Sequence, residues 1–292
     1  MRTWVAADAP ASIELLRRAT GDEQWPITAL EKLAGPSPRG APHTLAATID
    51  DQVAGVAVLD GNRIRLLAVD PAYQRRGVGT ALLDACVTAA RTTGANALRT
   101  MDCAGNYVSP GINAGDHATI AWLRRRGFAD APPVNTNLLV DVRTNPKVSA
   151  AASAAADQRV AAAGYQVRRA GTDEPALLTA IERDFSRAWA FEVARALAFS
   201  TGGVHVAERN GELAGFAAHD GNNSGLGWFG PAGTWPAHRG HGVGEALLLR
   251  CLLDVARVHP VCEVAWIGPR AFYERVAGVA GERQFLVLTR QL

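Results

Sequence analysis

The sequence lacks the features that mark several large classes of protein. It has only four cysteines in 292 residues and no C-x-x-C pair, which favours buried free thiols in a reduced, intracellular compartment. Thirty basic and 28 acidic residues leave a net charge of +2, so no cationic surplus exists for a nucleic acid. No run approaches the roughly 20 apolar residues of a membrane span, and the start MRTWVAADAPAS has no signal-peptide pattern. We therefore expect a cytoplasmic protein that binds neither nucleic acid nor membrane.

The chain does contain an internal repeat. Residues 74–83 match residues 239–248 at an offset of 165 positions, glycines included. Upstream, residues 53–55 match residues 213–215 at an offset of 160, and the difference of five fits a longer turn over residues 220–224. At about 100–200 residues per domain, the length also suggests two domains. The sequence therefore predicts two copies of one domain.

The two copies are expected to share one order of elements. In each, a strand, a helical region, a two-stranded hairpin and another strand lead to the repeated glycine motif and its helix, and then to a fifth strand, a short helix and a terminal strand. The expected segments of the first copy are 2–7, 12–19, 44–49, 53–59, 64–69, 97–101, 118–126 and 137–142. Those of the second are 165–169, 174–186, 204–208, 213–219, 227–234, 264–267, 269–276 and 284–289. The predicted fold class is a mixed α/β sheet in each copy, antiparallel at first and parallel after the glycine motif.

These segments place a first domain at residues 1–145 and a second at 165–292. Residues 146–164 between them are rich in alanine. Alanine favours helix, and Gly164 could end one. The connector is therefore either a surface linker or a helix that braces the domains.

The glycine motif has the properties of an anion-binding loop. Glycines lack β-carbons, so several consecutive N–H groups can point at phosphate oxygens, and the following helix adds its dipole at the same place. No Gly-Lys-Ser/Thr follows, so this is not a Walker loop, and Leu82 and Leu247 replace the third glycine of a dinucleotide fingerprint. A single motif of this kind could be an ordinary glycine-rich turn. The presence of a second copy favours anion binding over that interpretation.

Strand, Gln/Arg-x-x-Gly-x-Gly and helix together resemble the acetyl-coenzyme A signature of the GCN5-related N-acetyltransferases (GNAT), once in each half of the chain. The resemblance implies two tandem acyl-CoA N-acyltransferase (GNAT) domains, with acetyl-CoA as cofactor, coenzyme A as product and no metal. It assigns pyrophosphate binding to Gln74, Arg75, Arg76, Gly77, Val78, Gly79 and Thr80, and to Arg239, Gly240, His241, Gly242, Val243, Gly244 and Glu245. It assigns pantetheine and thioester contacts to Leu67, Ala68, Val69, Ala232, Gly233 and Thr234. Pro231 cannot donate to a ladder, so we expect a bulge or splay in the second copy.

Catalysis is expected in the second copy. The resemblance implies a tyrosine acid on the helix after the fifth strand, and Tyr273 matches that position whereas the first copy has Leu123. Glu263, which opens the fifth strand, is the candidate base, with a solvated carboxylate as the equal alternative. His219 and His241 are near the expected cleft in sequence, and His241 suits coenzyme A better than the amine.

The acceptor is expected to be a small-molecule amine, such as an amino sugar or an aminoglycoside-like compound, held by a protein that is a monomer or homodimer. Carboxylates and aromatics alternate over residues 182–192, which suits a cationic amine, although an ordinary amphipathic helix is the favoured interpretation. The architecture is similar to that of mycothiol synthase and of glucosaminide N-acetyltransferases. The alternative function is a non-catalytic protein that binds or senses acyl-CoA.

Overall fold

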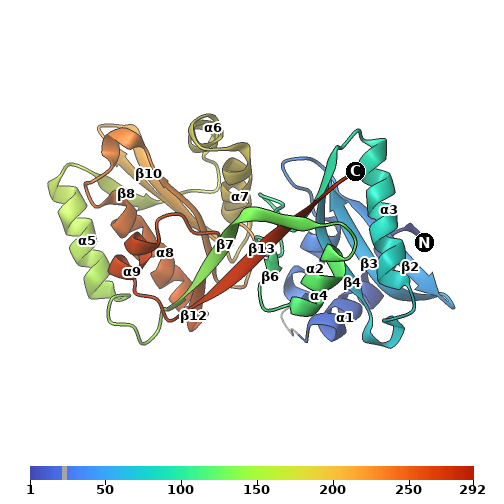
Figure 1. Cartoon of the computed structure of the whole chain (residues 1–292). Helices are drawn as coiled ribbons and strands as arrows, with labels where there is room; N and C mark the ends of the chain where they lie inside the picture. Colours follow the sequence, from blue (N-terminus) through green and yellow to red (C-terminus); the bar gives the residue numbers. More distant parts are fainter. Residues whose placement is uncertain (22–24) are drawn as a thin grey trace. The chain divides into compact units, whose positions relative to one another are not determined.

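The computed structural model describes Met1–Gly21 and Trp25–Leu292, and the chain divides into two compact units. The first unit comprises Met1–Asn135 together with Gln284–Leu292, and the second comprises Thr136–Arg283. Each unit has a mixed sheet with helices on both faces (Figure 1). The predicted fold class is confirmed.

The predicted elements occur in the predicted order, and the helices α2 (Trp25–Ala34) and α7 (Arg187–Ala198) and the short strand β6 (Ile112–Asn113) are additions that the sequence did not predict. The helices of the first unit are α1 (Ala9–Thr20), α2 (Trp25–Ala34), α3 (Val78–Thr92) and α4 (His117–Arg124), with short 3-10 helices at Ala6–Asp8 and Pro71–Tyr73. Its strands are β1 (Arg2–Thr3), β2 (His43–Ile49), β3 (Gln52–Asp60), β4 (Arg63–Val69), β5 (Ala97–Thr100) and β6 (Ile112–Asn113). The helices of the second unit are α5 (Ala150–Ala162), α6 (Pro175–Asp184), α7 (Arg187–Ala198), α8 (Val243–Ala256) and α9 (Arg270–Val276), with a 3-10 helix η3 at Pro236–His238. Its strands are β8 (Gln166–Arg169), β9 (Gly203–Arg209), β10 (Glu212–His219), β11 (Trp228–Thr234) and β12 (Val261–Val264), and two long strands, β7 (Ala129–Asp141) and β13 (Gly281–Gln291), run through both units.

Alternating side chains of the strands pack against different helices. In β3, Val56 and Val58 pack with α1 and α2, whereas Ala57 and Leu59 pack with α3 and α4. In β10 of the second unit, Phe216 and Ala218 pack with α6 and α7, whereas Ala217 packs with α8. Successive side chains of a strand point to opposite faces of the sheet. Because helices cover both faces, both sets of side chains are apolar and the strand sequences are nearly continuous apolar runs.

The terminal strands are exchanged between the units, which the sequence did not predict. The end of β13, residues 289–291, pairs antiparallel with β5 in the first unit. Residues 138–141 of β7 pair antiparallel with β12 in the second unit. Each repeat is therefore completed by the last strand of the other repeat. The residues 1–145 and 165–292 describe how the sequence repeats, whereas the compact units divide within β7 and β13.

The alanine-rich connector is largely a helix. Ser149 begins α5, where its hydroxyl accepts a hydrogen bond from the amide of Ala152 at 3.2 Å. Ala156 and Val160 of α5 are buried in the core that includes Leu247 and Leu248 of α8. The bracing role is therefore within the second unit, where α5 covers α8.

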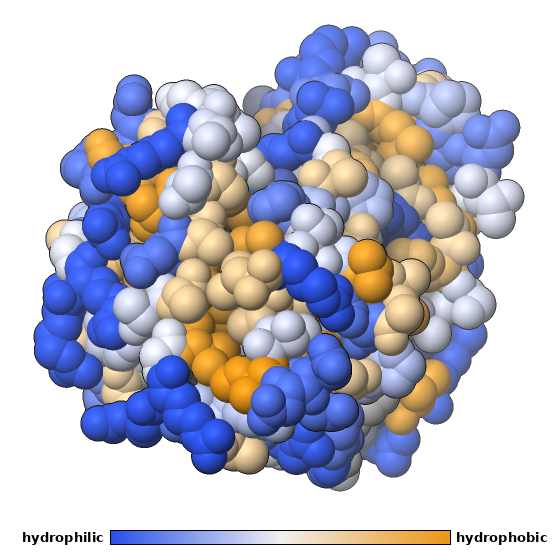
Figure 2. All heavy atoms as spheres, turned by 90° about the vertical axis from the view of Figure 1, so that its right-hand side faces the viewer, coloured by the Kyte–Doolittle hydropathy of each residue, from blue (hydrophilic) through white to orange (hydrophobic). Residues whose placement is uncertain are grey.

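On the face drawn in Figure 2, hydrophilic side chains lie mainly around the margin, and hydrophobic and weakly polar side chains gather over the middle. None of the helices in the described part of the chain is long and apolar enough to cross a membrane. All four cysteines are free and buried, and burial raises the pKa of Cys86 to about 12.

Candidate functional site

In each unit a glycine-rich loop joins a central strand to a long helix. In the second unit residues 239–242 lead from η3 into α8, and in the first unit residues 74–77 lead into α3. Gly242 and Gly77 begin these helices, each with a φ of +83°. A side chain is strained in that region, which explains the glycine at this position in both copies.

The loops present a row of backbone donors. Among the described residues, nothing accepts a hydrogen bond from the backbone amides of residues 240–245 or of residues 75–80. Six successive N–H groups at the start of a helix, reinforced by the helix dipole, are an arrangement that suits an anion such as pyrophosphate. Both loops are exposed at their tips, so this site is open to a ligand.

The side chains of the two loops repeat one supporting contact. Gln74 donates from Nε2 to the carbonyl of Val69 at 3.3 Å, and Arg239 donates from Nε to the carbonyl of Thr234 at 3.1 Å. Each bond ties the loop back to the strand before it. In the second unit His241 also lies against Tyr165, with ring centroids 5.7 Å apart. Tyr165 was not among the predicted site residues, and its hydroxyl approaches His238 Nδ1 at 3.3 Å.

The strand before each loop leaves five of its seven residues unpaired on one side. In the second unit β11 pairs with β12 only at Trp228 and Phe229, so residues 230–234 have an open edge toward β12. In the first unit β4 pairs with β5 only at Arg63 and Ile64, so residues 65–69 are open in the same way. The predicted pantetheine contacts lie on these open edges: Leu67, Ala68, Val69, Ala232, Gly233 and Thr234. An open strand edge offers the N–H and C=O groups that an extended amide chain can pair with.

Both strands are bulged where the edge opens. Between β10 and β11 the register shifts by one residue, which places the extra residue around Gly230 and Pro231. Between β3 and β4 it shifts between Ile64 and Leu66, at Arg65. The expected irregularity at Pro231 is thus confirmed, and the first unit reaches the same geometry without a proline.

Tyr273 lies close to the point where β11 and β12 separate. Its ring is edge-on to Phe229, the last paired residue of β11, with centroids 6.4 Å apart, and edge-on to Phe272 at 5.1 Å. Phe272 in turn borders Gly244 at the start of α8. No described side chain or carbonyl forms a hydrogen bond with the Tyr273 hydroxyl, and burial raises the pKa of Tyr273 to about 12. The phenol is therefore protonated at neutral pH and unengaged.

Glu263 lies on the other face of β12. Its neighbours Cys262 and Val264 pack toward α8, so by the alternation of the strand Glu263 points to the side that carries α6 and α7. It is 8% exposed, accepts a hydrogen bond from Asn137 Nδ2 at 2.7 Å, and is 3.3 Å from Arg283. Burial raises the pKa of the Glu263 carboxyl, although the bond from Asn137 opposes this. It is a buried carboxyl rather than a solvated one, and the structure brings it into no contact with Tyr273.

Asn137 is a site residue that the sequence did not reveal. It is fully buried in β7, and its Oδ1 accepts the amide of Trp266 at 2.7 Å while its Nδ2 holds Glu263. No motif surrounds it, because the strand that carries it comes from the first repeat.

The structure places the two candidate histidines, His241 and His219, in different parts of the second unit. His241 lies in the glycine loop as expected. His219 does not lie near the cleft, because it ends β10 and contacts Asp254 in the last turns of α8. Eleven helical residues, or roughly 16 Å, separate Asp254 from the start of α8. Sequence proximity misled here because β10 and β11 are antiparallel, so their turn points away from the loop.

An aromatic cluster covers the α6–α7 side of the open edge. Phe185 stacks on Trp189 at 5.5 Å and is edge-on to Trp235 at 5.1 Å. A Cβ on Gly233 would be 2.6 Å from the Phe185 ring, so the strand approaches the cluster closely only because glycine is there. Trp235 Nε1 donates to Asp184 at 2.8 Å. Phe185 and Trp189 of the segment 182–192 therefore form an apolar wall, and the Asp184 carboxylate lies at its edge.

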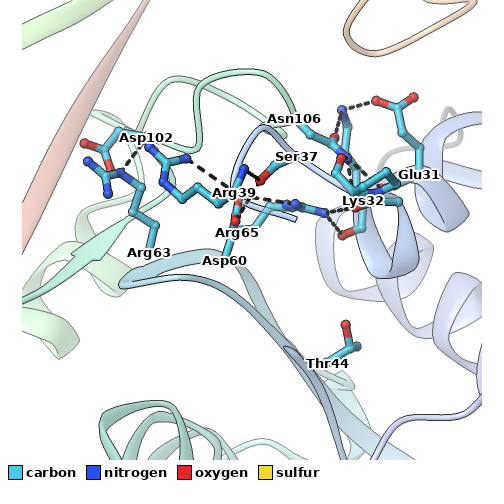
Figure 3. Close-up of polar contacts among 12 residues, drawn as sticks. Glu31, Lys32, Ser37, Arg39, Thr44, Asp60, Arg63, Arg65, Asp102 and Asn106 are labelled. Carbon is cyan, nitrogen blue, oxygen red and sulfur yellow. Dashed lines mark hydrogen bonds and ion pairs between the residues drawn. The ribbon is translucent and has the colours of Figure 1, made fainter. Parts of the chain in front are cut away.

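The first unit replaces this arrangement with a buried polar network (Figure 3). The guanidinium of Arg65, from the bulge of β4, is fully buried and donates to the carbonyls of Lys32 at 3.2 Å and Gly35 at 2.7 Å. It also forms an ion pair with Asp60 at 3.2 Å. Lys32 donates to Asn106 at 2.9 Å, and Asn106 lies in the loop between β5 and β6.

Asn106 then ties that loop to the end of α2. Its Nδ2 donates to the carbonyls of Glu31, Gly35 and Pro36 at 3.1, 3.2 and 2.9 Å. Leu123 occupies the position of Tyr273 and is 4% exposed, while its neighbour Trp122 borders Gly79 as Phe272 borders Gly244. The first unit thus keeps the loop, but polar side chains surround the bulge and a leucine stands where the second unit has Tyr273.

Within the described residues, no group of three or more His, Cys, Asp or Glu side chains is arranged to hold a metal ion.

Comparison with known proteins relates both halves to one family. Residues 23–103 match the acetyltransferase (GNAT) domain and residues 174–279 match the acetyltransferase (GNAT) family. The glucosamine N-acetyltransferase region of a fungal multi-domain GH3 β-N-acetylglucosaminidase aligns with a TM-score of 0.75 at 17% identity, over 99% of this chain and 37% of that chain. A tandem GNAT protein from the clavulanic acid biosynthesis pathway gives 0.70 at 21% identity, over 98% and 97% of the two chains. A GCN5-related N-acetyltransferase from Sphaerobacter thermophilus gives 0.63 at 17%, over 99% and 94%. No curated protein sequence matches the chain significantly.

Proposed function

Because the chain belongs to the GCN5-related N-acetyltransferases as a tandem two-domain member, we propose that its second unit transfers the acetyl group of acetyl-CoA to the primary amine of a small molecule. The observation that carries the proposal is the position of Tyr273. It lies beside Phe229, where β11 and β12 begin to diverge, on the helix that borders the glycine loop. Among the described residues, only this unit has a tyrosine on the helix that borders the glycine loop, because the first unit has Leu123 at that position.

Two parts of this unit support the binding of coenzyme A. The free amides of residues 240–245 suit its pyrophosphate, and the exposed Arg239 and His241 add donors beside them. Residues 232–234 offer the unpaired strand edge to pantetheine. Acetyl-CoA supplies the acyl group as a thioester.

Tyr273 is suited to act as the acid. The thiolate of coenzyme A is a weaker base than the Tyr273 phenolate. A thiol has an ordinary pKa near 8.5, whereas the pKa of Tyr273 is about 12. Complete proton transfer to such a thiolate is therefore uphill, so the phenol assists by donating a hydrogen bond to the sulfur as negative charge develops on it, and the released thiolate takes its proton from solvent. Phe229 and Phe272 beside it are apolar and accept no hydrogen bond, so the hydroxyl is available to the substrate.

Glu263 is suited to take the proton of the amine. It lies on the α6–α7 side, where the aromatic wall of Phe185 and Trp189 would hold the apolar part of an acceptor. Its raised pKa brings it closer to that of an effective base at neutral pH than an exposed glutamate would be. Asn137 fixes its direction through one hydrogen bond, leaving the second oxygen to Arg283 or the substrate.

The first unit is proposed to bind acyl-CoA without transferring the group. Its loop amides are as free as those of the second unit, yet Leu123 carries no proton and the network of Arg65, Lys32 and Asn106 takes up the acceptor side. A binding or sensing role is therefore favoured for this unit alone.

Coenzyme A release, measured with a thiol reagent, tests the proposal against amino sugars, polyamines, amino acids and aminoglycosides. Gly244→Asp and its matched control Gly79→Asp assign the active unit. A Cβ at either glycine would lie 3.5 Å or more from its nearest neighbours, so both variants should fold. Each variant places a negatively charged carboxylate in one glycine loop, where it repels the pyrophosphate. We expect Gly244→Asp to abolish transfer and Gly79→Asp to retain it.

The reverse result would mean that the chemistry resides in the first unit. Acetyl-CoA binding without coenzyme A release for any amine would instead favour the sensing alternative.

A further inference from the structure

The second unit contains a polar cavity at the end of α8 that is distant from the glycine loop. Its volume is about 260 Å³, and the side chains that carry charge around it are Arg169, His219, Asp220, Asp254, Arg257 and His259. Roughly 16 Å of helix separates Asp254 from the start of α8. The proposed acetyl transfer uses none of these residues.

Asp254 already has several polar partners within the protein. Its Oδ2 is bonded to His205 Nε2 at 2.8 Å and to Arg169 Nη1, and Arg169 also donates to the carbonyl of Gly202 at 3.2 Å. Burial by itself would raise the pKa of Asp254, but the bond from His205 and the neighbouring cations outweigh it and hold that pKa well below its ordinary value. The carboxylate charge of Asp254 is therefore balanced within the protein.

The His219 ring lacks a hydrogen bond from any described residue and makes one longer ion-pair contact, with Asp254. It is 4% exposed, and that contact joins Asp254 Oδ2 to Nε2 at 3.6 Å. Burying a polar ring without a bond is unfavourable, so such groups are rare unless a ligand or water completes them. A Cβ on Gly203 would be 2.4 Å from Nε2 of His219 and 2.7 Å from Arg169, so glycine there leaves the room that both side chains occupy.

The first unit shows that the fold does not need these polar groups. Strand pairing aligns the units, because Gly203 pairs with His219 in β9–β10 as His43 pairs with Leu59 in β2–β3. The positions that correspond to Arg169, His205, His219 and Asp254 are Thr3, Leu45, Leu59 and Ala89. Leu45 and Leu59 are buried in an ordinary apolar core, and Ala89 packs against it. A buried charged cluster is seldom more stable than such apolar packing, so its presence in one unit only indicates a use.

We propose that this cavity binds a small oxyanion, a phosphate or carboxylate group, between Arg257 and His219. Arg257 is 78% exposed at the rim and makes only a 3.5 Å contact with Asp254, so its donors are available. Asp220, the other carboxyl of the lining, accepts the amide of Trp228 at 3.0 Å, and burial raises its pKa. With two arginines and two histidines around two carboxyls, the cavity offers a surplus of donors, and an anion would satisfy both Arg257 and the unbonded His219 ring.

The test follows the ring signals of the seven histidines by NMR at fixed pH while inorganic phosphate, or in a second series acetate, is added to the full-length protein. A His219→Gln variant assigns the His219 signal. We expect this signal to shift along a saturable curve, with phosphate, acetate or both showing which oxyanion the site accepts. Because the signal is specific, phosphate that binds only at the glycine loops would move His238 and His241 and leave His219 unchanged, and that result would overturn the proposal.

Arg257→Gln supplies the decisive variant, since this residue is exposed and its loss leaves the core intact. Loss of one charge-assisted hydrogen bond should weaken the His219 response by about tenfold. The matched control is Arg91→Gln, an exposed arginine in the last turn of the corresponding helix α3, which should leave the response unchanged. An equal response in Arg257→Gln and the unmodified protein would contradict the assignment of the site.

Discussion

Replacing Tyr273 by phenylalanine is the sharpest test of the proposed chemistry. The change removes one hydroxyl and keeps the ring, whose contacts with Phe229 and Phe272 are apolar. Since no described residue hydrogen-bonds the hydroxyl, its loss should change the free energy of unfolding by less than about 1 kcal/mol. The effect on catalysis is expected to be much larger. Loss of a positioned acid lowers turnover by about 10²–10⁴, which corresponds to about 3–5 kcal/mol of activation free energy.

The assay combines coenzyme A release with calorimetric titration of coenzyme A. Turnover should fall while affinity for coenzyme A stays within a few-fold, because the glycine loop is untouched. In the unmodified enzyme the pKa of about 12 keeps the phenol protonated, so Tyr273 should produce no loss of activity on the alkaline side up to pH 10, where an ordinary tyrosine is half ionised.

The matched control is Leu123→Ala in the first unit. Truncating this buried leucine should reduce stability by about 2–5 kcal/mol without a specific effect on the chemical step. If Tyr273→Phe retains near-normal turnover with the true acceptor, the tyrosine only packs the core and the acid is another group.

Three further changes test other parts of the structure. Burial raises the pKa of Glu263, so activity should be lost on acidification at a pH above the ordinary glutamate value of 4.5, and Glu263→Gln should remove this limb of the pH–rate profile along with most of the activity. Arg65→Leu leaves Asp60, which is 1% exposed, without its closest cation, and urea denaturation should show a loss of about 3–5 kcal/mol. Gly233→Ala drives a methyl group into the Phe185 ring, which should cost about 1–3 kcal/mol and lower the melting temperature, whereas an unchanged melting temperature would show that the aromatic cluster yields freely.

The sequence alone determined the features that are local in the chain. The glycine loops could be predicted because a left-handed φ at Gly77 and Gly242, and the free amides that follow, depend on a few neighbouring residues. The irregularity at Pro231 could be predicted for the same reason, since a proline lacks the N–H of a ladder. Element order followed from apolar periodicity, and its repetition in the second copy gave the tandem architecture.

Tertiary structure decided which distant residues meet. The terminal strands carry the same alternating pattern, and that pattern specifies a buried face but not a partner, so the exchange that brings Asn137 beside Glu263 was invisible in the sequence. The network of Arg65, Lys32 and Asn106 likewise joins a bulge, a helix end and a loop that lie far apart in the chain. His205 lies in β9, His219 ends β10 and Asp254 lies in α8. Only the packing of α8 against these two strands brings the three side chains together. Side-chain chemistry of this kind depends on where elements pack, because contact distances of 3 Å are set by the assembled core and not by spacing along the chain.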